Sequence, residues 1–314
     1  MEKVIYMKSY LPEGYLLNTR ENAINTSCYE KLRDASLKNE HLEARAVFCD
    51  GEHNLHVDFG FMHGIIPRTE CALGIAEGTT RDIAIIARVN KPVRFTVTHF
   101  GITDGKPVAY LSRRAVQEDY IKSRLAALTP GDVIPARVTH LENFGAFCDI
   151  GCGINALLPI DNISVSRIPH PNARFSVGDD IRVIIKSFDG DGRVTLSHKE
   201  LLGTWAENAA QFSPGETVSG IIRSVENYGV FVELTPNLAG LAEYTPNVSE
   251  GMNASVYIKS IIPEKMKFKL IIVDSFEADY PPAEFSYFTD ADHISRFRYS
   301  PISSVREIET VFDD

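Results

Sequence analysis

The chain has few cysteines and no long apolar run. Its 314 residues include five cysteines and one tryptophan, and no CxxC pair occurs, which argues against a zinc ribbon or a disulfide scaffold. No apolar run approaches the ~20 residues needed to span a bilayer, and the first residues do not resemble a secretory signal. We therefore expect a cytoplasmic protein with reduced thiols and no membrane partner.

The sequence also lacks the motifs of common catalytic sites. There is no HExxH, GxSxG, Walker or GxGxxG element, and the histidines form no metal-binding cluster. The carboxylates show no pairing that stands out from a solvated surface. We therefore predict a protein that is not an enzyme, with no metal, no cofactor and no small-molecule substrate.

Positive charge is scarce as well. The net charge is −10, and residues 274–314 contain three Lys or Arg against ten Asp or Glu, so the rest of the chain is close to neutral. A nearly neutral body argues against a protein that coats duplexes by charge alone. It is compatible with a protein that holds single strands by stacking.

What the chain does have is an internal repeat. LTPGDVIPARVTHLENFGAFCDI (128–150) aligns with FSPGETVSGIIRSVENYGVFVEL (212–234) at a constant offset. Each copy predicts five short strands separated by turn residues. In the first of these copies the predicted strands are roughly 133–141, 144–150, 155–159, 180–188 and 193–199. Five strands with one long connection after the third suggest a small barrel of the OB type.

A fainter copy precedes these two, so we predict an all-β dominated fold of three tandem five-stranded OB barrels with short helical connectors. The expected segments are an N-terminal extension with a helix at 1–41, barrels at 42–115, 130–199 and 214–274, connectors at 116–129 and 200–213, and an acidic tail at 275–314. The tail has no clear periodicity, and we expect it to be partly ordered at most. Trp205 is expected to pack its connector against a barrel.

The second repeat resembles a known domain. GDVIPARVTHLENFGAFCDIGCGINALLP, followed by VGDDIRVIIKSFDGDGRVTLSHK, is similar to the S-one domain, an OB-fold RNA-binding unit repeated in a small-subunit ribosomal protein. Residues 40–274 as a whole resemble a short bacterial protein of the ribosomal S-one type. The resemblance implies RNA held by two aromatic residues of an FGxF element, a histidine on strand three, an aspartate before strand five and an arginine that opens it.

The resemblance assigns candidate RNA-binding residues in the second and third repeats. In the second repeat they are Phe144, Phe147, Asp189 and Arg193, while Pro159 occupies the histidine position. In the third repeat they are Tyr228, Phe231 and Lys267, while Glu243 occupies the histidine position. Lys267 also belongs to a run in which Lys265, Lys267 and Lys269 alternate along a strand. These lysines either contact RNA or protect a solvated strand edge.

The first repeat departs further from the pattern. Alignment on Asp58 places His53 and His56 at the aromatic positions and Val108 at the arginine position. By analogy with the leading domains of the family, the first barrel is expected to contact the small ribosomal subunit or another protein rather than RNA.

The spacing of Phe144 and Phe147 raises a question that does not depend on the resemblance. Residues three apart on a regular strand face opposite sides. A bulge at Gly145 would bring both rings to one outer face, where each could stack on a base. The alternative is that Phe147 is barrel core. Tyr228 in the copy favours the outer face, because a phenolic hydroxyl prefers wet surroundings.

Together these features predict an RNA-binding protein of the translation apparatus that holds single-stranded RNA, with mRNA as the expected ligand. The alternative is a protein-interaction scaffold or regulator built of degenerate S-one barrels with little RNA affinity. An RNA-processing enzyme with these barrels as accessories is a third class, but no stretch is left over for a catalytic domain.

Overall fold

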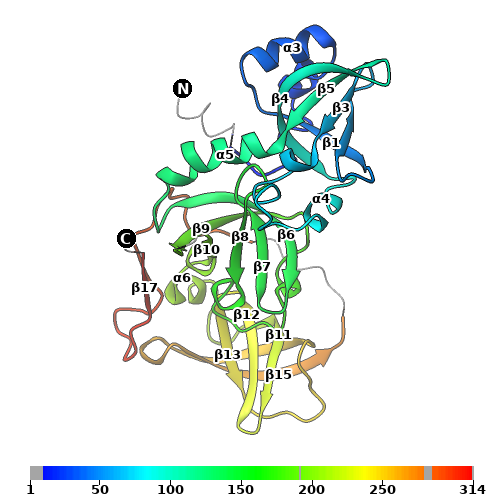
Figure 1. Ribbon diagram of the computed structural model, residues 1–314. Coiled ribbons are helices and arrows are strands. Elements are labelled where there is room, and N and C mark those ends of the chain that lie inside the picture. The colour runs from blue at the N-terminus through cyan, green and yellow to red at the C-terminus, as the bar shows by residue number, and fades with distance from the viewer. Residues whose placement is uncertain (1–9, 191, 279–284, 313–314) are drawn as a thin grey trace. The chain divides into compact units, whose positions relative to one another are not determined.

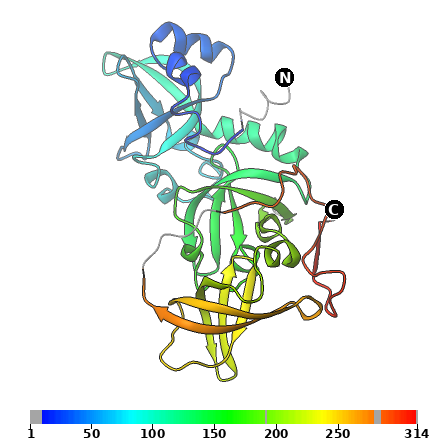
Figure 2. The ribbon, with the colours of Figure 1, turned by 180° about the vertical axis from the view of Figure 1, so that it is seen from behind.

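Strands dominate the computed structural model, which describes residues 10–190, 192–278 and 285–312 (Figures 1 and 2). The all-β dominated fold predicted from the sequence is confirmed. The chain divides into two compact units, one of Met1–Leu128 with Asp149–Asn155 and one of Thr129–Cys148 with Ala156–Asp314. Each unit has its own buried hydrophobic cluster.

The first unit contains a closed barrel, drawn in blue to cyan-green in Figure 1, whose strands pair in the order β1-β2-β3-β5-β4. Its strands are β1 (Leu42–Cys49), β2 (Leu55–Asp58), β3 (His63–Ile66), β4 (Pro92–Thr103) and β5 (Lys106–Ser112). Its helices and 3-10 turns are α2 (Arg20–Asn25), α3 (Tyr29–Leu37), η1 (Arg68–Glu70), α4 (Ile83–Ile86), α5 (Arg113–Ser123) and η2 (Leu125–Ala127). The N-terminal helix expected from the sequence is therefore a pair of short helices.

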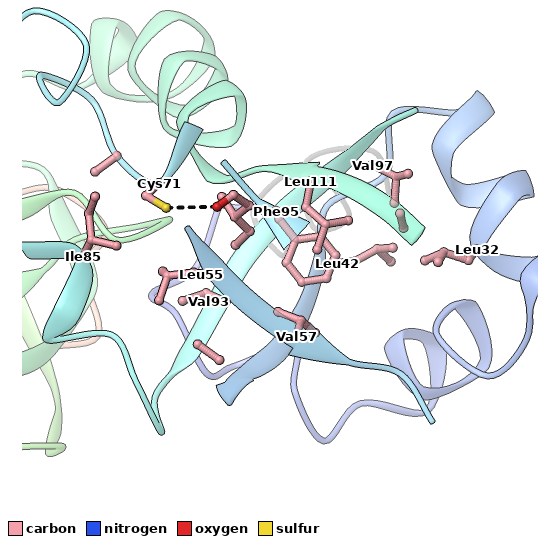
Figure 3. Packing of buried hydrophobic residues seen from close by; sticks show 14 of the residues in the cluster. Leu32, Leu42, Leu55, Val57, Cys71, Ile85, Val93, Phe95, Val97 and Leu111 are labelled. Carbon is pink, nitrogen blue, oxygen red and sulfur yellow. Dashed lines mark hydrogen bonds between the residues drawn. The ribbon is translucent and has the colours of Figure 1, made fainter. Parts of the chain in front are cut away.

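Alternate residues of these strands fill the first barrel. Leu55 and Val57 of β2 and Phe95 of β4 are completely buried, and Figure 3 shows them among the packed side chains of the barrel. Each such side chain contributes about 1.5–3 kcal/mol relative to an exposed one. The buried Cys71 thiol lies 3.4 Å from the Ile66 carbonyl, and burial raises its pKa to about 12, so it remains an unreactive thiol.

Buried ion pairs anchor the segment that precedes the helices of the first unit. The Arg113 guanidinium donates to both carboxylate oxygens of Glu13, at 2.6 and 2.9 Å. The carboxylate of Glu43 accepts from Arg94 at 2.9 Å and from three backbone N–H groups between residues 14 and 17. Because removing one partner of such a pair leaves an uncompensated buried charge, these contacts fix the segment on the barrel.

The second unit contains two more closed barrels, with strand orders β10-β8-β7-β6-β9 and β11-β12-β13-β15-β14. The strands of the former, green in Figure 1, are β6 (Val133–Glu142), β7 (Gly145–Asp149), β8 (Asn155–Pro159), β9 (Asp180–Phe188) and β10 (Val194–Ser197). Those of the latter, yellow to orange, are β11 (Thr217–Glu226), β12 (Gly229–Thr235), β13 (Leu238–Ala242), β14 (Asn253–Ile262) and β15 (Lys267–Phe276). The strands predicted at 155–159 and 180–188 coincide with β8 and β9.

Short helical turns connect the strands of the second unit. They are η3 (Ile160–Asn162), η4 (Pro171–Ala173), η5 (Lys199–Leu202), α6 (Trp205–Ala209) and η6 (Pro263–Lys265). Trp205 is buried in the hydrophobic cluster of the last barrel, with its ring 5.8 Å from that of Phe268 in a T-shaped contact. The prediction that Trp205 packs its connector against a barrel is confirmed.

The expectation that the tail is partly ordered at most is wrong for residues 285–312. The two-stranded sheet of β16 (Arg296–Arg298) and β17 (Glu309–Val311) lies in this segment. The N–H of Ile294 donates to the carbonyl of Gly131 at 2.9 Å, and Tyr299 is buried with its hydroxyl donating to the carbonyl of Asn237 at 2.6 Å. These tertiary contacts order a segment that has no periodicity of its own. Residues 279–284 and 313–314 of the predicted tail lie outside the described residues, as do residues 1–9 of the predicted extension.

Candidate nucleic-acid interface

The two phenylalanines of the FGxF element lie next to each other at the β6–β7 hairpin. Phe144 occupies the turn between the strands and is 55% exposed, whereas Phe147 lies on β7 and is half-buried. Their ring centroids are 6.1 Å apart and the ring planes are perpendicular. Ala146 and Cys148, on either side of Phe147, are completely buried, so Phe147 points away from the barrel interior. The alternative that Phe147 is barrel core is therefore excluded.

The predicted bulge at Gly145 is wrong as an explanation of this arrangement. Phe144 precedes the strand, so the strand's alternation does not apply to it. In the copy, the pairing of β11 with β12 runs without a shift through Glu226↔Gly229 and is instead irregular between Ile222 and Ser224. In the third barrel the bulge therefore lies on β11, at Arg223, and not at Gly229, the equivalent of Gly145.

The glycine of the motif is required for a different reason. A Cβ atom on Gly145 would lie 2.4 Å from the carbonyl oxygen of Leu158, and one on Gly229 would lie 2.4 Å from that of Ala242. Both contacts are far shorter than any that real Cβ atoms make. Glycine thus allows β7 and β12 to approach the next strand closely just after the exposed ring.

The third barrel reproduces the aromatic pair. Tyr228 lies in the β11–β12 turn and is 69% exposed, and Phe231 on β12 is half-buried. Their ring centroids are 6.2 Å apart at an interplanar angle of 87°. The two repeats thus present the same perpendicular pair of rings, and in each pair the ring in the turn is mostly exposed to solvent.

Strand register relates Lys267 to Arg193. Thr195 of β10 pairs with Leu157, and Lys269 of β15 pairs with Leu241, which is the repeat equivalent of Leu157. Two residues before these positions are Arg193 and Lys267. Both are exposed; Lys267 is the first residue of β15, and Arg193 directly precedes β10. The register therefore places Arg193 and Lys267 at corresponding positions of the two barrels, and their contact with RNA stays a prediction.

Asp189 has a structural role in the hairpin that carries Arg193. Its backbone N–H donates to the carbonyl of Arg193 at 2.9 Å, and its side-chain oxygen accepts from the backbone N–H of Arg193 at 2.8 Å. Both groups close the β9–β10 turn. These hydrogen bonds fix the start of β10 and hence the position of the Arg193 backbone.

The lysine run does not form one face of a strand. Lys265 lies in η6, and Met266 adopts a left-handed conformation with φ of 48°, so the strand starts only at Lys267. Lys267 and Lys269 are exposed on β15 and share one face. Glu243, at the histidine position of this repeat, is exposed just after β13.

A histidine that the repeat pattern does not reveal lies beside the aromatic pair. His140 of β6 stacks on Phe147, with centroids 6.4 Å apart and planes 27° from parallel. Its Nε2 lies 2.8 Å from the carboxylate of Glu142. The histidine position of the motif holds Pro159, but an imidazole reaches the site from the adjacent strand instead. Repeat alignment offers no signal for it, because its equivalent in the third barrel is Ser224.

Metal-binding clusters and membrane-spanning helices are absent from the part of the chain that the structure describes. Within it, no group of three or more His, Cys, Asp or Glu side chains is arranged to hold a metal ion. Over the same residues, no helix is both long and apolar enough to cross a membrane.

Comparisons with known proteins agree with the resemblance seen in the motif. Residues 128–199 match the S1 RNA binding domain, which is the S-one domain named above. The small ribosomal subunit protein bS1 of Staphylococcus aureus is 31% identical over 234 residues, which cover 73% of this chain and 57% of that protein. The bS1 protein of Staphylococcus haemolyticus is 28% identical over 317 residues, covering 96% of this chain and 77% of that protein.

The chain thus spans a little over half the length of the S. aureus relative. A solved multidomain protein with nucleic acid binding domains from Streptococcus pneumoniae aligns over 76% of this chain and 75% of its own, at 14% identity and a TM-score of 0.25, a similarity too low to decide fold or function. Residues 128–199 form an S1 RNA binding domain, in a chain that resembles the bacterial ribosomal proteins bS1.

Proposed function

We propose that the protein binds single-stranded RNA in the translation apparatus and is not an enzyme, and that its three barrels are tandem S1 domains of the OB type. The RNA lies across the outer faces of the second and third barrels. The observation that carries the proposal is the repeated perpendicular ring pair, Phe144 with Phe147 and Tyr228 with Phe231, at the same hairpin of both barrels.

The exposure of these rings supports binding by stacking. Phe144 and Tyr228 are 55% and 69% exposed, so neither ring fills a hydrophobic core. Large aromatic side chains exposed to solvent are typical of binding surfaces. A base that stacks on such a ring contributes about 1–3 kcal/mol with little sequence preference. Binding on this surface is therefore sequence-tolerant.

Phosphate contacts come from one cation in each barrel. Arg193 and Lys267 occupy corresponding positions, each two residues before the residue that lies in register with the inner ring of its pair, and His140 adds an imidazole next to Phe147. A planar guanidinium can also stack on a base, which a lysine ammonium cannot. The second barrel is therefore the stronger of the two sites, and Asp189 contributes by shaping the turn that holds Arg193.

The cellular setting is inferred from the relatives, which are named as small ribosomal subunit proteins. By that similarity the protein acts in the cytoplasm, with mRNA as its ligand and the small ribosomal subunit as its partner. Co-sedimentation with ribosomes at graded salt tests this setting separately from RNA binding.

The direct test measures affinity for an unstructured oligouridine by fluorescence anisotropy. The variant Phe144→Ala/Phe147→Ala should bind at least tenfold more weakly than the unmodified protein, because two stacking surfaces are lost. Val177→Ala is the matched control, since Val177 is an equally exposed apolar residue of the same barrel (60%) outside the ring pair. Unchanged affinity in the double variant would remove the second barrel from the mechanism.

The same titration addresses the alternative of a protein scaffold. If the unmodified protein fails to bind oligouridine at low salt and still co-sediments with ribosomes, the barrels act through protein contacts and the RNA-binding proposal is wrong.

A further inference from the structure

In each barrel the central aromatic position belongs to a row of five side chains that crosses all five strands. In the third barrel the row is Ser224, Phe231, Leu241, Lys269 and Ser260. In the second barrel, strand pairing and the repeat give His140, Phe147, Leu157, Thr195 and Ser187. In the first barrel the row is Phe48, His56, Ile65, Tyr110 and His99.

The first barrel, which the sequence marks as the most divergent, has the most aromatic row. Four of its five positions hold a ring, against two in the second barrel and one in the third. Alignment along one strand finds only His56 at the position of Phe147. Across the strands, however, the pair Phe48–His56 corresponds to the pair His140–Phe147, with the phenyl ring and the imidazole exchanged. The stacking pair is therefore retained in the first barrel.

Backbone geometry turns Phe48 toward solvent. The pairing of β1 with β2 shifts between Ala46 and Phe48, which places a bulge at Val47. This is the position of the bulge at Arg223 in the third barrel. Phe48 is 44% exposed and lies flat against the ring of His56, with centroids 4.2 Å apart and planes 7° from parallel. The exposed part of the Phe48 ring is accessible to a ligand.

A hydrogen-bonded chain holds the imidazoles beneath Phe48. Nε2 of His56 lies 2.9 Å from the carboxylate of Asp50, and Nδ1 of His56 lies 2.8 Å from Nε2 of His63. Although desolvation opposes it, hydrogen bonding from His56 and Asn54 lowers the pKa of Asp50, which keeps the carboxylate ionised. An ionised Asp50 fixes His56 as a donor at Nε2, so the two imidazoles form an oriented surface rather than mobile side chains.

The far end of the row carries a second stacked pair. The rings of His99 and Tyr110 are 4.5 Å apart and 10° from parallel. The Tyr110 hydroxyl lies 3.1 Å from that of Thr103, and a Cβ on Gly101 would come within 3.0 Å of the Tyr110 ring. Glycine at 101 thus leaves room for the ring to lie against the strand. Phe48 and Tyr110 are three strands apart along the row, so a strand spacing of about 4.8 Å puts their Cα atoms at most about 14 Å from each other.

We propose that this row on the first barrel is a further binding site for single-stranded RNA, with Phe48 and Tyr110 as the rings on which bases stack. The inference rests on the proposed RNA-binding function and extends it to the barrel expected to contact a protein. Four of the five side chains in the row are flat rings and none is a carboxylate, which suits bases rather than phosphates; the ionised Asp50 contacts the row through Nε2 of His56. The site accordingly takes unpaired bases of any sequence.

The test uses the full chain in which the other two sites are disabled, Phe144→Ala/Phe147→Ala/Tyr228→Ala/Phe231→Ala. We expect this background to retain measurable oligouridine binding by anisotropy. Adding Phe48→Ala/Tyr110→Ala should weaken that residual binding at least fivefold, the lower limit for one lost stack. Adding Phe61→Ala should leave it unchanged, because Phe61 is an equally exposed phenylalanine of the same barrel (38%) that contacts Phe59 and lies outside the row.

Cross-linking of the unmodified protein to 4-thiouridine RNA gives an independent readout that does not depend on how the variants fold. Cross-linked peptides that include Phe48 or Tyr110 support the inference. Cross-links confined to residues 130–274, or residual binding insensitive to Phe48→Ala/Tyr110→Ala, overturn it while leaving the proposed function intact. A third outcome is that the variant Phe48→Ala/Tyr110→Ala loses co-sedimentation with ribosomes but keeps all RNA binding. The row would then contact a protein partner, and the inference would be overturned. Absence of any RNA binding by the unmodified protein overturns both.

Discussion

Single residues decide how the aromatic pairs are presented, and Gly145 is the clearest case. It lies between Phe144 and Phe147, where a side chain would collide with the backbone of the next strand rather than with a movable side chain. The hairpin would have to shift to admit even a methyl group. The geometry of the ring pair therefore depends on a residue that has no side chain of its own.

Gly145→Ala should destabilise the second barrel by about 1–3 kcal/mol, the usual cost of overpacking. Gly190→Ala is the control, because a Cβ on Gly190 meets nothing within 4 Å. Urea unfolding measures the free energy of unfolding of both variants. Equal stability of the two would show that the close approach at Leu158 is not a constraint.

His198 gives the second unit a dependence on pH. Its ring is completely buried, Nδ1 donates to the carbonyl of Ile163 at 3.0 Å, and Nε2 lies 3.3 Å from the Tyr287 hydroxyl. Burial lowers the pKa of His198 to about 4. The unfolded chain, with a histidine pKa of about 6.5, then binds more protons than the folded protein between these values.

The contribution of neutral His198 is therefore complete above about pH 6.5 and is lost as the pH falls toward 4. By linkage this amounts to roughly 3 kcal/mol. Denaturant unfolding at a series of pH values should show this loss in the unmodified protein and a shallower slope in His198→Asn. An identical slope in the variant would mean that other groups cause the acid sensitivity.

Sequence reasoning predicted the ring pairs but not their neighbours. Phe144, Phe147, Tyr228 and Phe231 are recognisable because the repeat preserves their spacing along one strand. His140 and Phe48 lie on the first strand of their own barrels, and in the first barrel a bulge at Val47 sets the register of Phe48. A single sequence contains the alternation within a strand but does not show which residues face each other across two strands.

Among the elements, the strands were predictable and the tail was not. Turn residues such as the Asp-Gly sequence at 189–192 mark strand ends locally, so the predicted ranges of β6 to β10 agree with the structure to within two residues. The segment 285–312 has no local signal of this kind. It is ordered by contacts to distant residues, such as the hydrogen bond between Nδ1 of His293 and the carboxylate of Asp132 at 2.8 Å.

The tail segment should therefore contribute to the stability of the second unit. Tyr299 is buried, its hydroxyl donates to Asn237, and its carbonyl accepts from the N–H of Trp205. Tyr299→Ala should lower the free energy of unfolding by about 3–5 kcal/mol, as for other buried aromatic residues. Ile302→Ala, at a position 90% exposed in the same segment, should have no effect. A Tyr299→Ala protein of unchanged stability would indicate that the tail only rests on the barrels.

At the scale of the whole molecule, the second and third barrels are joined within one unit. Arg174 donates to Glu233 at 2.6 Å in a buried ion pair, and the N–H of Val165 donates to the Asn237 side chain at 3.0 Å. The two proposed binding surfaces therefore belong to one compact unit. A strand long enough to reach both gains affinity through effective concentration without any new contact.

Affinity should thus rise steeply with RNA length until both surfaces are occupied. For long oligouridine, Tyr228→Ala/Phe231→Ala should weaken binding by a factor on the order of 10². For oligomers too short to bridge the barrels, the same variant should lose only about twofold, because the second-barrel site remains. Anisotropy with a series of lengths measures both. A loss independent of length would show that the barrels bind separately.

The charge distribution sets how this binding responds to salt. The net charge is −10, and the candidate cations on the two faces are Arg193 in the second barrel and Lys267 and Lys269 in the third, of which Lys269 is in register with Phe231. Single-stranded RNA that contacts two or three cations should give a plot of log affinity against log salt with a slope of roughly −1.4 to −2.1. Stacking supplies the rest of the binding free energy and is insensitive to salt. Substantial affinity should therefore persist at 0.5 M salt. A slope steeper than about −4 would require many more phosphate contacts than these faces offer and would contradict binding by stacking.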